Sequence, residues 1–268
     1  MNIKDKRLFL LDMDGTLYLG NRLFDGVTDF LALIKERGGR YMFLTNNSSK
    51  SADAYVEKLE SLGIKAEPSD FFSSTEATIM YLIKNGYKDK RIYAFGTASF
   101  RRQLLEAGLD VTDSYEKGID VLLCGFDTEL TFKKLDDASR LLFDGAEFIA
   151  THPDWVCPTE YGSVPDCGSV CQMLTIATGK APTVIGKPKP EMVYAAMETC
   201  GASPDETVMI GDRIYTDIAC GINAGVDAIL VLSGETTLED ANKSDIVPTR
   251  ICRDISEIYG KYLRKEAL

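Results

Sequence analysis

The sequence predicts an α/β protein whose core is a doubly wound parallel sheet, with a smaller α/β unit inserted into it. Short apolar, β-branched or aromatic runs alternate with segments of helical period, which is typical of a parallel sheet covered by helices. Polar clusters directly follow several of these runs, as expected where ligands bind at the carboxyl ends of parallel strands. Neither an all-β nor an all-α fold fits this alternation.

The elements of the core come from both ends of the chain. The first part predicts a strand, a helix that ends at Gly38 and Gly39, a strand and a helix, over residues 7–12, 26–39, 40–46 and 51–64. The last part predicts three strands alternating with two helices, over residues 183–187, 189–202, 206–212, 216–226 and 227–234. We therefore expect residues 1–78 and 181–268 to form the Rossmann-like catalytic core.

The middle of the chain predicts a second unit of the same style, a cap over residues 79–180. Its expected strands are residues 91–96, 120–126 and 147–153, and its expected helices are residues 97–109, 131–145 and 168–179. Residues 84–90 and 178–182 each contain glycine and lysine, the second also proline, and are the expected hinges.

Composition excludes several classes of function. The 268 residues carry a net charge of -11, so a general affinity for nucleic acid is not expected. No apolar run reaches transmembrane length and the N-terminus lacks a signal-peptide core, which predicts a cytoplasmic protein that does not bind membranes. The seven cysteines are scattered, and Cys167 and Cys171 have no second pair or histidine cluster for a zinc site, so we expect reduced thiols.

Four polar clusters follow predicted core strands and should meet at one edge of the sheet. They are residues 12–16 (DMDGT), 45–48 (TNNS), 187–188 (KP), and Asp212 with Asp217. Together they supply carboxylates, hydroxyl and amide groups, and one lysine. This inventory suits the binding of a phosphate beside a metal ion.

Magnesium is the metal that these side chains predict. Mg²⁺ takes oxygen ligands, usually one or two carboxylates with water and substrate phosphate, and Asp12 and Asp212 can supply the carboxylates. Thr45, Lys187 and the backbone N–H groups around Gly15 and Asn46 can hold phosphate oxygens, and Gly15 permits close approach of the backbone. An anionic substrate is therefore compatible with the acidic chain.

The four motifs DMDGT, TNN, GKPKP and GDRIYTD resemble those of the haloacid dehalogenase superfamily of aspartate-nucleophile phosphatases. Their order, with a unit inserted between TNN and GKPKP, is similar to the NagD / 4-nitrophenylphosphatase subfamily with its type IIA cap. VLLCGFD, ATHPD, PDCGS and GVDAILVLSG extend the resemblance over nearly the whole chain. One motif alone would be a weak signal, whereas four in order are specific.

The resemblance implies a role for each motif residue. Asp12 resembles the nucleophile that forms an aspartyl-phosphate, and Asp14 the general acid that later activates water. Thr45 and Asn46 resemble phosphate-binding residues, and Lys187 the cation that steadies Asp12 and the phosphoryl group. Asp212 resembles a metal ligand beside the Asp12 carboxylate and the Asp14 carbonyl. Asp217 resembles an acid that orients water or Lys187.

The inserted unit offers further candidates for substrate contact. Asp127, His152 and Asp154 follow expected strands and are predicted to face the substrate. A structural role for His152 is the alternative, and as the only histidine it has no partner for a triad. The resemblance has asparagine at position 152, so the substrate preference of well-known members does not transfer.

The predicted function is Mg²⁺-dependent hydrolysis of small phosphomonoesters such as sugar phosphates, nucleoside monophosphates or phosphoglycolate. A phosphotransferase or phosphomutase, and a phospho-acceptor protein that uses the same aspartate, are the alternatives; Asp14 and the large insertion are unexplained in the latter. The sequence does not identify the physiological substrate, and it leaves a homodimer open.

Overall fold

The computed structural model describes residues 2–159 and 161–264, which divide into two compact units. The first unit contains Met1–Thr45, Tyr55–Phe72 and Lys187–Leu268, and the second contains Asn46–Ala54 and Ser73–Gly186. For comparison, the sequence predicted a cap over residues 79–180. Among the described residues, no helix combines the length and the apolar character needed to cross a membrane.

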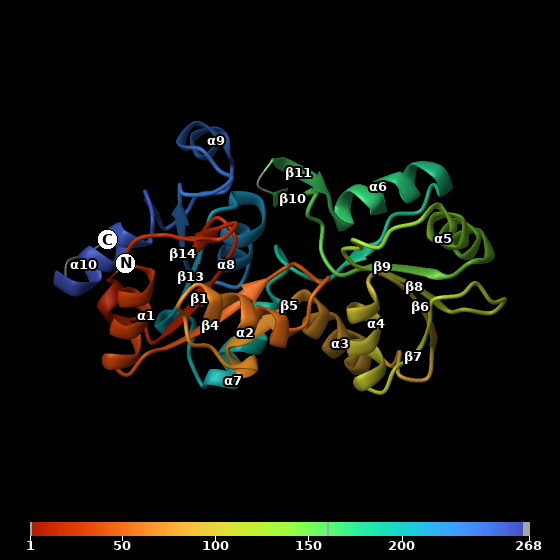
Figure 1. Ribbon diagram of the computed structural model, residues 1–268, viewed down its shortest axis with the longest axis horizontal. Coiled ribbons are helices and arrows are strands. Elements are labelled where there is room, and N and C mark those ends of the chain that lie inside the picture. The colour runs from red at the N-terminus through yellow and green to blue at the C-terminus, as the bar shows by residue number, and fades with distance from the viewer. Residues whose placement is uncertain (1, 160, 265–268) are drawn as a thin grey trace. The chain divides into compact units, whose positions relative to one another are not determined.

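A six-stranded sheet in the order β15-β14-β13-β1-β4-β5 forms the centre of the first unit (Figure 1). Its strands are β1 (Leu8–Leu11), β4 (Arg40–Thr45), β5 (Phe71–Ser73), β13 (Thr207–Gly211), β14 (Asp227–Val231) and β15 (Arg250–Cys252). β1 pairs in parallel with both β4 and β13, and β13, β14 and β15 also pair in parallel. The chain therefore extends the sheet in one direction after β1 and in the other after β13, which confirms the predicted doubly wound fold.

Helices and a small hairpin complete the first unit. They are the hairpin β2 (Tyr18–Leu19) and β3 (Arg22–Leu23), and α1 (Val27–Glu36), α2 (Ala52–Ser61, from Tyr55 on), α7 (Glu191–Cys200), α8 (Ala219–Asn223), α9 (Leu238–Lys243) and α10 (Ile255–Arg264). Phe9 of β1 packs against Phe30 of α1 and Tyr262 of α10, with ring centroids 5.7 and 5.6 Å apart. These edge and tilted ring contacts anchor the strand that carries the DMDGT motif.

The second unit has its own five-stranded sheet, in the order β12-β9-β8-β6-β7. Its elements are α3 (Ser74–Lys84), β6 (Arg91–Phe95), α4 (Ala98–Glu106), β7 (Asp110–Thr112), β8 (Val121–Cys124), α5 (Phe132–Asp144), β9 (Glu147–Ala150), the antiparallel hairpin β10 (Val156–Thr159) and β11 (Gly162–Pro165), α6 (Cys167–Thr178), and β12 (Thr183–Val184). α5 and α6 pack together, and Figure 1 shows them on the face of the sheet opposite α3 and α4. The predicted α/β architecture of the inserted unit is thus present.

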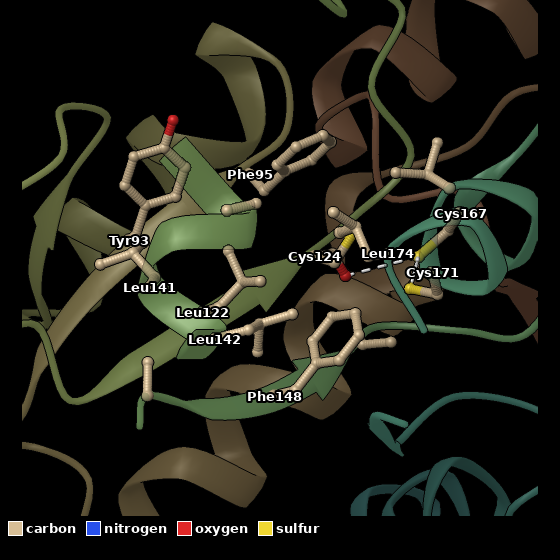
Figure 2. Close-up of a cluster of buried hydrophobic side chains, with 14 of the residues drawn as sticks. Tyr93, Phe95, Leu122, Cys124, Leu141, Leu142, Phe148, Cys167, Cys171 and Leu174 are labelled. Atoms are coloured by element: carbon tan, nitrogen blue, oxygen red, sulfur yellow. Dashed lines mark hydrogen bonds between the residues drawn. The ribbon is translucent and has the colours of Figure 1, made fainter. Parts of the chain in front are cut away.

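The core of the second unit lies between its sheet and the pair α5 and α6. Figure 2 shows its aromatic and aliphatic side chains together with three cysteines; the labelled members are Tyr93, Phe95, Leu122, Cys124, Leu141, Leu142, Phe148, Cys167, Cys171 and Leu174. Every one of these side chains is less than a tenth exposed. This unit therefore buries a hydrophobic core of its own.

The prediction for the strand at residues 183–187 is wrong. It was expected in the core sheet, whereas β12, which lies within these residues, pairs in parallel with β9 of the second unit. β12 has only two residues, and so short an apolar run fits either sheet until the tertiary pairing is known. Lys187 consequently does not follow a core strand, although it belongs to the first unit.

Candidate active site

Asp12 and Asp14 lie just beyond the carboxyl end of β1, at the centre of the first unit's sheet. The Asp12 N–H donates to the Ile210 carbonyl at 2.9 Å, which continues the pairing of β1 with β13 by one residue. Gly15 then turns the chain with φ of 85°, a conformation that favours glycine. The loop therefore leaves the sheet with two carboxylates at the edge where parallel sheets bind ligands.

Asp212 occupies the corresponding position after the neighbouring strand β13. Its Oδ2 accepts the Glu235 N–H at 2.6 Å, and its side chain is buried. A Cβ at Gly15 would lie 2.5 Å from Oδ2, and one at Gly234 only 2.0 Å away. Two glycines therefore let the backbone of adjacent loops close around this carboxylate.

Asp217 lies on a π-helical turn, Ile214–Ile218, that follows Asp212. Its Oδ2 accepts the Arg213 N–H at 3.0 Å, and its Oδ1 accepts from Lys187 Nζ at 2.6 Å. Single π turns inside helical segments are frequent at functional sites, because the extra residue redirects a side chain. Here the turn directs Asp217 toward the lysine.

Lys187 is the charged centre of the group. Its Nζ contacts Asp12 Oδ1 at 2.7 Å and Asp217 Oδ1 at 2.6 Å, and donates to the Leu44 carbonyl at 3.0 Å. Burial alone would lower the pKa of Lys187, but Asp12 and Asp217 raise it above its usual value. The ammonium group is therefore charged at neutral pH and holds the nucleophile candidate in place.

Asp12, Asp212 and Asp217 each place one carboxylate oxygen within 4.8 Å of the others. Burial, followed by the charge of Asp217, raises the pKa of Asp12 well above its usual range despite Lys187. The same two causes raise the pKa of Asp212 to about 7. One lysine does not neutralise three carboxylates, and a divalent cation with oxygen ligands fits this donor set.

These pKa shifts predict a pH-dependent stabilisation by magnesium. A carboxyl group whose pKa is raised on folding stabilises the protein while it is protonated, and this contribution is lost as the pH rises through its folded pKa, about 7 for Asp212. The metal-free protein should therefore lose stability between pH of about 5.5 and about 8, and Mg²⁺ should restore it. We expect saturating Mg²⁺ to raise the unfolding temperature more at the higher pH, measured by differential scanning calorimetry. An equal rise at both values would contradict the proposed ligand set.

A second group of contacts surrounds Asp14, and the sequence did not predict it. The Tyr18 hydroxyl donates to Asp14 Oδ2 at 3.5 Å, and Lys58 Nζ lies 3.5 Å from Oδ1 and 4.0 Å from the centre of the Tyr18 ring. Burial, and then the charge of Asp14, raises the pKa of the Tyr18 phenol above its usual value, so it keeps its proton and remains a donor. Lys58 lies on α2, eleven positions beyond the end of the TNN motif, where a lysine on an expected helix has the same sequence signature as a surface residue.

The residues predicted to bind phosphate differ in the unit to which they belong and in the contacts that they make. Thr45, the last residue of β4, is buried in the first unit beside β1. The Gly15 N–H donates to the Tyr18 carbonyl at 2.8 Å, so this N–H is already engaged and Gly15 contributes through its missing Cβ. Asn46 falls in the second unit, where its amide donates to Asp154 Oδ1 at 2.9 Å.

The three cap candidates are all buried within the second unit. Asp127 pairs with Lys134 Nζ at 2.7 Å. His152 is 0% exposed, with Nδ1 3.7 Å from Asp154 Oδ2 and Nε2 3.6 Å from Asp166 Oδ1. Burial raises the pKa of Asp166 to about 6, although His152 lowers it. Each candidate thus has polar contacts inside its own unit, and substrate contact by these residues stays a prediction.

Known proteins are similar to this chain over nearly all of its length. Models for haloacid dehalogenase-like hydrolases match residues 9–110 and 184–258. An acid sugar phosphatase of Staphylococcus aureus is 34% identical over 95% of this chain and 97% of its own length. The solved 4-nitrophenylphosphatase of Thermotoga maritima has a TM-score of 0.91 and 37% identity, covering 98% of this chain and 99% of its own.

A solved glycerol phosphate phosphatase of Mycobacterium tuberculosis, in complex with magnesium, has a TM-score of 0.90 and 28% identity over 96% of this chain and 78% of its own. The similarity in sequence and in structure therefore extends through both units. The family predicted from the four motifs is confirmed, and the chain belongs to the haloacid dehalogenase-like hydrolases, among their NagD and 4-nitrophenylphosphatase-like phosphatases.

Proposed function

We propose that the protein hydrolyses small phosphomonoesters with Mg²⁺, through an aspartyl-phosphate on Asp12. The observation that carries the proposal is the position of Lys187 Nζ, 2.7 Å from Asp12 Oδ1 and 2.6 Å from Asp217 Oδ1, beside Asp212. A buried cation among three carboxylates positions a nucleophile and leaves acidic oxygens for a metal. The sugar, nitrophenyl and glycerol phosphatases among the similar proteins support small monoesters as the substrate class.

In the first step the Asp12 carboxylate attacks phosphorus, and the bond from phosphorus to the ester oxygen breaks. Lys187 holds the attacking carboxylate and balances charge on the phosphoryl group, while Asp14 donates a proton to the departing oxygen. Thr45, at the end of β4, would bind a phosphate oxygen. Bound through Asp12, Asp212 and the Asp14 carbonyl, magnesium would offset the negative charge that the phosphate brings.

In the second step water attacks the aspartyl-phosphate. Asp14, now ionised, accepts a proton from that water, and inorganic phosphate leaves with Asp12 regenerated. Asp217 keeps Lys187 oriented in both steps through its 2.6 Å contact. One aspartate therefore forms the covalent bond and the other transfers protons.

The second unit is proposed to act as the cap that selects the substrate. The chain passes between the units four times, and two of these passages, directly after Thr45 and directly before Lys187, are covalently joined to residues of the proposed site. A cap of this size would exclude water from the intermediate and restrict the enzyme to small substrates. Comparable kcat/KM values on phosphorylated proteins and on small monoesters would contradict this role.

Steady release of phosphate from p-nitrophenyl phosphate tests the proposed function. We expect turnover in Mg²⁺, its loss when EDTA removes the metal, and its recovery when Mg²⁺ is added back. A phospho-acceptor protein would instead take up one phosphate and stop, and a phosphomutase would need a sugar acceptor. Full activity in the metal-free protein would contradict the proposed site. A screen of small phosphomonoesters by kcat/KM would then define the substrate.

The contacts of Lys58 predict a selective defect when its charge is removed. Lys58→Met keeps the apolar stem but removes the cation 3.5 Å from Asp14 Oδ1. The two side chains are 23% and 39% exposed, so the interaction contributes about 1 kcal/mol or less, a factor of about 5 in rate. We expect single-turnover transfer from an alkyl phosphate to slow by this factor and transfer from p-nitrophenyl phosphate to change little.

Lys58→Arg is the matched control, because it retains a cation over the Tyr18 ring. It should preserve the wild-type ratio of the two transfer rates. Equal slowing of both substrates in Lys58→Met would show that Lys58 supports the fold without positioning Asp14.

A further inference from the structure

Three cysteine side chains meet in the core of the second unit, which contains none of the carboxylates of the proposed catalytic group. Cys124 ends β8, and Cys167 and Cys171 lie on the first two turns of α6 (Figure 2). They are 0%, 0% and 4% exposed, and all three are free thiols. Each places its sulfur within 4.8 Å of the other two. The fold thus gathers soft ligand atoms from a strand and a helix that are far apart in sequence.

The spacing of these sulfurs fits a shared metal ion. With metal–sulfur bonds of about 2.3 Å, as in zinc thiolates, three sulfurs in one plane around an ion stand about 4.0 Å apart. Cys167 Sγ and Cys171 Sγ are 3.9 Å apart, and the other separations do not exceed 4.8 Å. A shift of the Cys124 side chain by about 1 Å or less would therefore complete a trigonal site.

The number and kind of ligands decide which ion fits. Structural zinc sites are almost always tetrahedral, with four protein ligands. Among the described residues, no further His, Cys, Asp or Glu joins this group, and His152 belongs to a separate group with Asp154 and Asp166. The thiols are too deeply buried for water to serve as a fourth ligand. Thiolates select soft ions, and Cu(I) is the soft ion that accepts three sulfur ligands.

The Cys167 sulfur makes a weak contact that a bound ion would replace. Cys167 is the first residue of α6, after the N-cap Asp166. In the metal-free protein its Sγ contacts the Cys124 carbonyl oxygen at 3.4 Å, which is the dashed line in Figure 2. A thiol that coordinates an ion gives up this contact, and the ion takes its place as partner.

We propose that Cys124, Cys167 and Cys171 form a trigonal binding site for Cu(I). Each thiol that coordinates releases its proton to solvent, and the copper stays Cu(I), so no oxidant or reductant takes part. The bound ion joins the end of β8 to the first turns of α6. It should stabilise the second unit against unfolding, because it binds the folded state and the site does not exist in the unfolded chain.

Anaerobic titration of the full-length, reduced protein with Cu(I) held by a chromophoric Cu(I) chelator tests the proposal. Wild type should withdraw one equivalent of copper from the chelator. Cys124→Ser and Cys171→Ser should each lose this binding, because a hydroxyl is a hard and weak ligand for Cu(I). Cys252→Ser is the matched control, since Cys252 is buried in β15 of the first unit and should leave copper binding unchanged.

Unfolding temperature and circular dichroism report whether the variants fold. If they do not, X-ray absorption of the wild-type copper complex decides, and a shell of three sulfurs at about 2.3 Å is expected. Copper retained by the folded serine variants, a shell with nitrogen or oxygen, or tighter binding of Zn²⁺ than of Cu(I) would each overturn the proposal. Absence of copper binding by wild type would do the same, and the cysteines would then serve only as small apolar side chains of the core.

Discussion

Asp12→Asn should abolish turnover on every phosphomonoester, whatever its leaving group. An amide oxygen is a far weaker nucleophile than a carboxylate and cannot form the aspartyl-phosphate. No other carboxylate can take over, because Asp217 is occupied by Lys187 and Arg213 and Asp212 by the Glu235 N–H. We expect no phosphate release above background and no phosphate on the acid-quenched protein, whereas wild type should carry phosphate there.

This loss should occur without loss of the fold. Lys187 keeps its 2.6 Å contact with Asp217 in the variant, and removal of one carboxylate relieves its repulsion with Asp212 and Asp217. The metal-free variant should therefore unfold at a temperature no lower than wild type. Asp12→Glu, which retains the charge but moves it by one methylene, should also be inactive, because the attack geometry is lost. Measurable turnover in folded Asp12→Asn would mean that another group is the nucleophile.

The proposed catalytic group could be predicted from sequence because its members are tied to strand ends. Asp12 and Asp212 directly follow β1 and β13, which are adjacent and parallel, so their convergence follows from the topology of the sheet. Lys187 was also identified, although the strand thought to deliver it belongs to the other sheet. The GKPKP motif, and not the expected strand, identified this lysine.

Features that depend on tertiary packing could not be predicted in the same way. Lys58 approaches Asp14 because α2 packs beside the loop after β1, and no spacing in the sequence encodes that contact. The spacing of Cys167 and Cys171 was visible, but the position of Cys124 beside them depends on how α6 packs against the sheet of the second unit. The passage into the second unit at Ser73 falls within the short strand β5, where the sequence shows no change in composition.

Asp14→Asn should separate substrates by their leaving groups. General acid catalysis typically contributes about 10²–10⁴-fold and is most important when the leaving oxygen is strongly basic. An alkoxide from a sugar or from glycerol needs a proton as it departs, whereas p-nitrophenolate is stable without one. Phosphoryl transfer from an alkyl phosphate to Asp12 should therefore slow by about this factor, and transfer from p-nitrophenyl phosphate much less.

The second step should become limiting for p-nitrophenyl phosphate in this variant. Asparagine cannot accept the proton of the attacking water, so the aspartyl-phosphate should accumulate. Rapid mixing should show a burst of p-nitrophenol, close to one equivalent per Asp12, with phosphate left on the protein. Lys58→Met is a comparison with a smaller expected effect, because it leaves the Asp14 carboxyl in place. It should slow the alkyl phosphate more than p-nitrophenyl phosphate, as Asp14→Asn does, but without the burst. Equal loss on both substrates in single-turnover transfer, with no burst, would mean that Asp14 is not the general acid and that proton transfer belongs to another group.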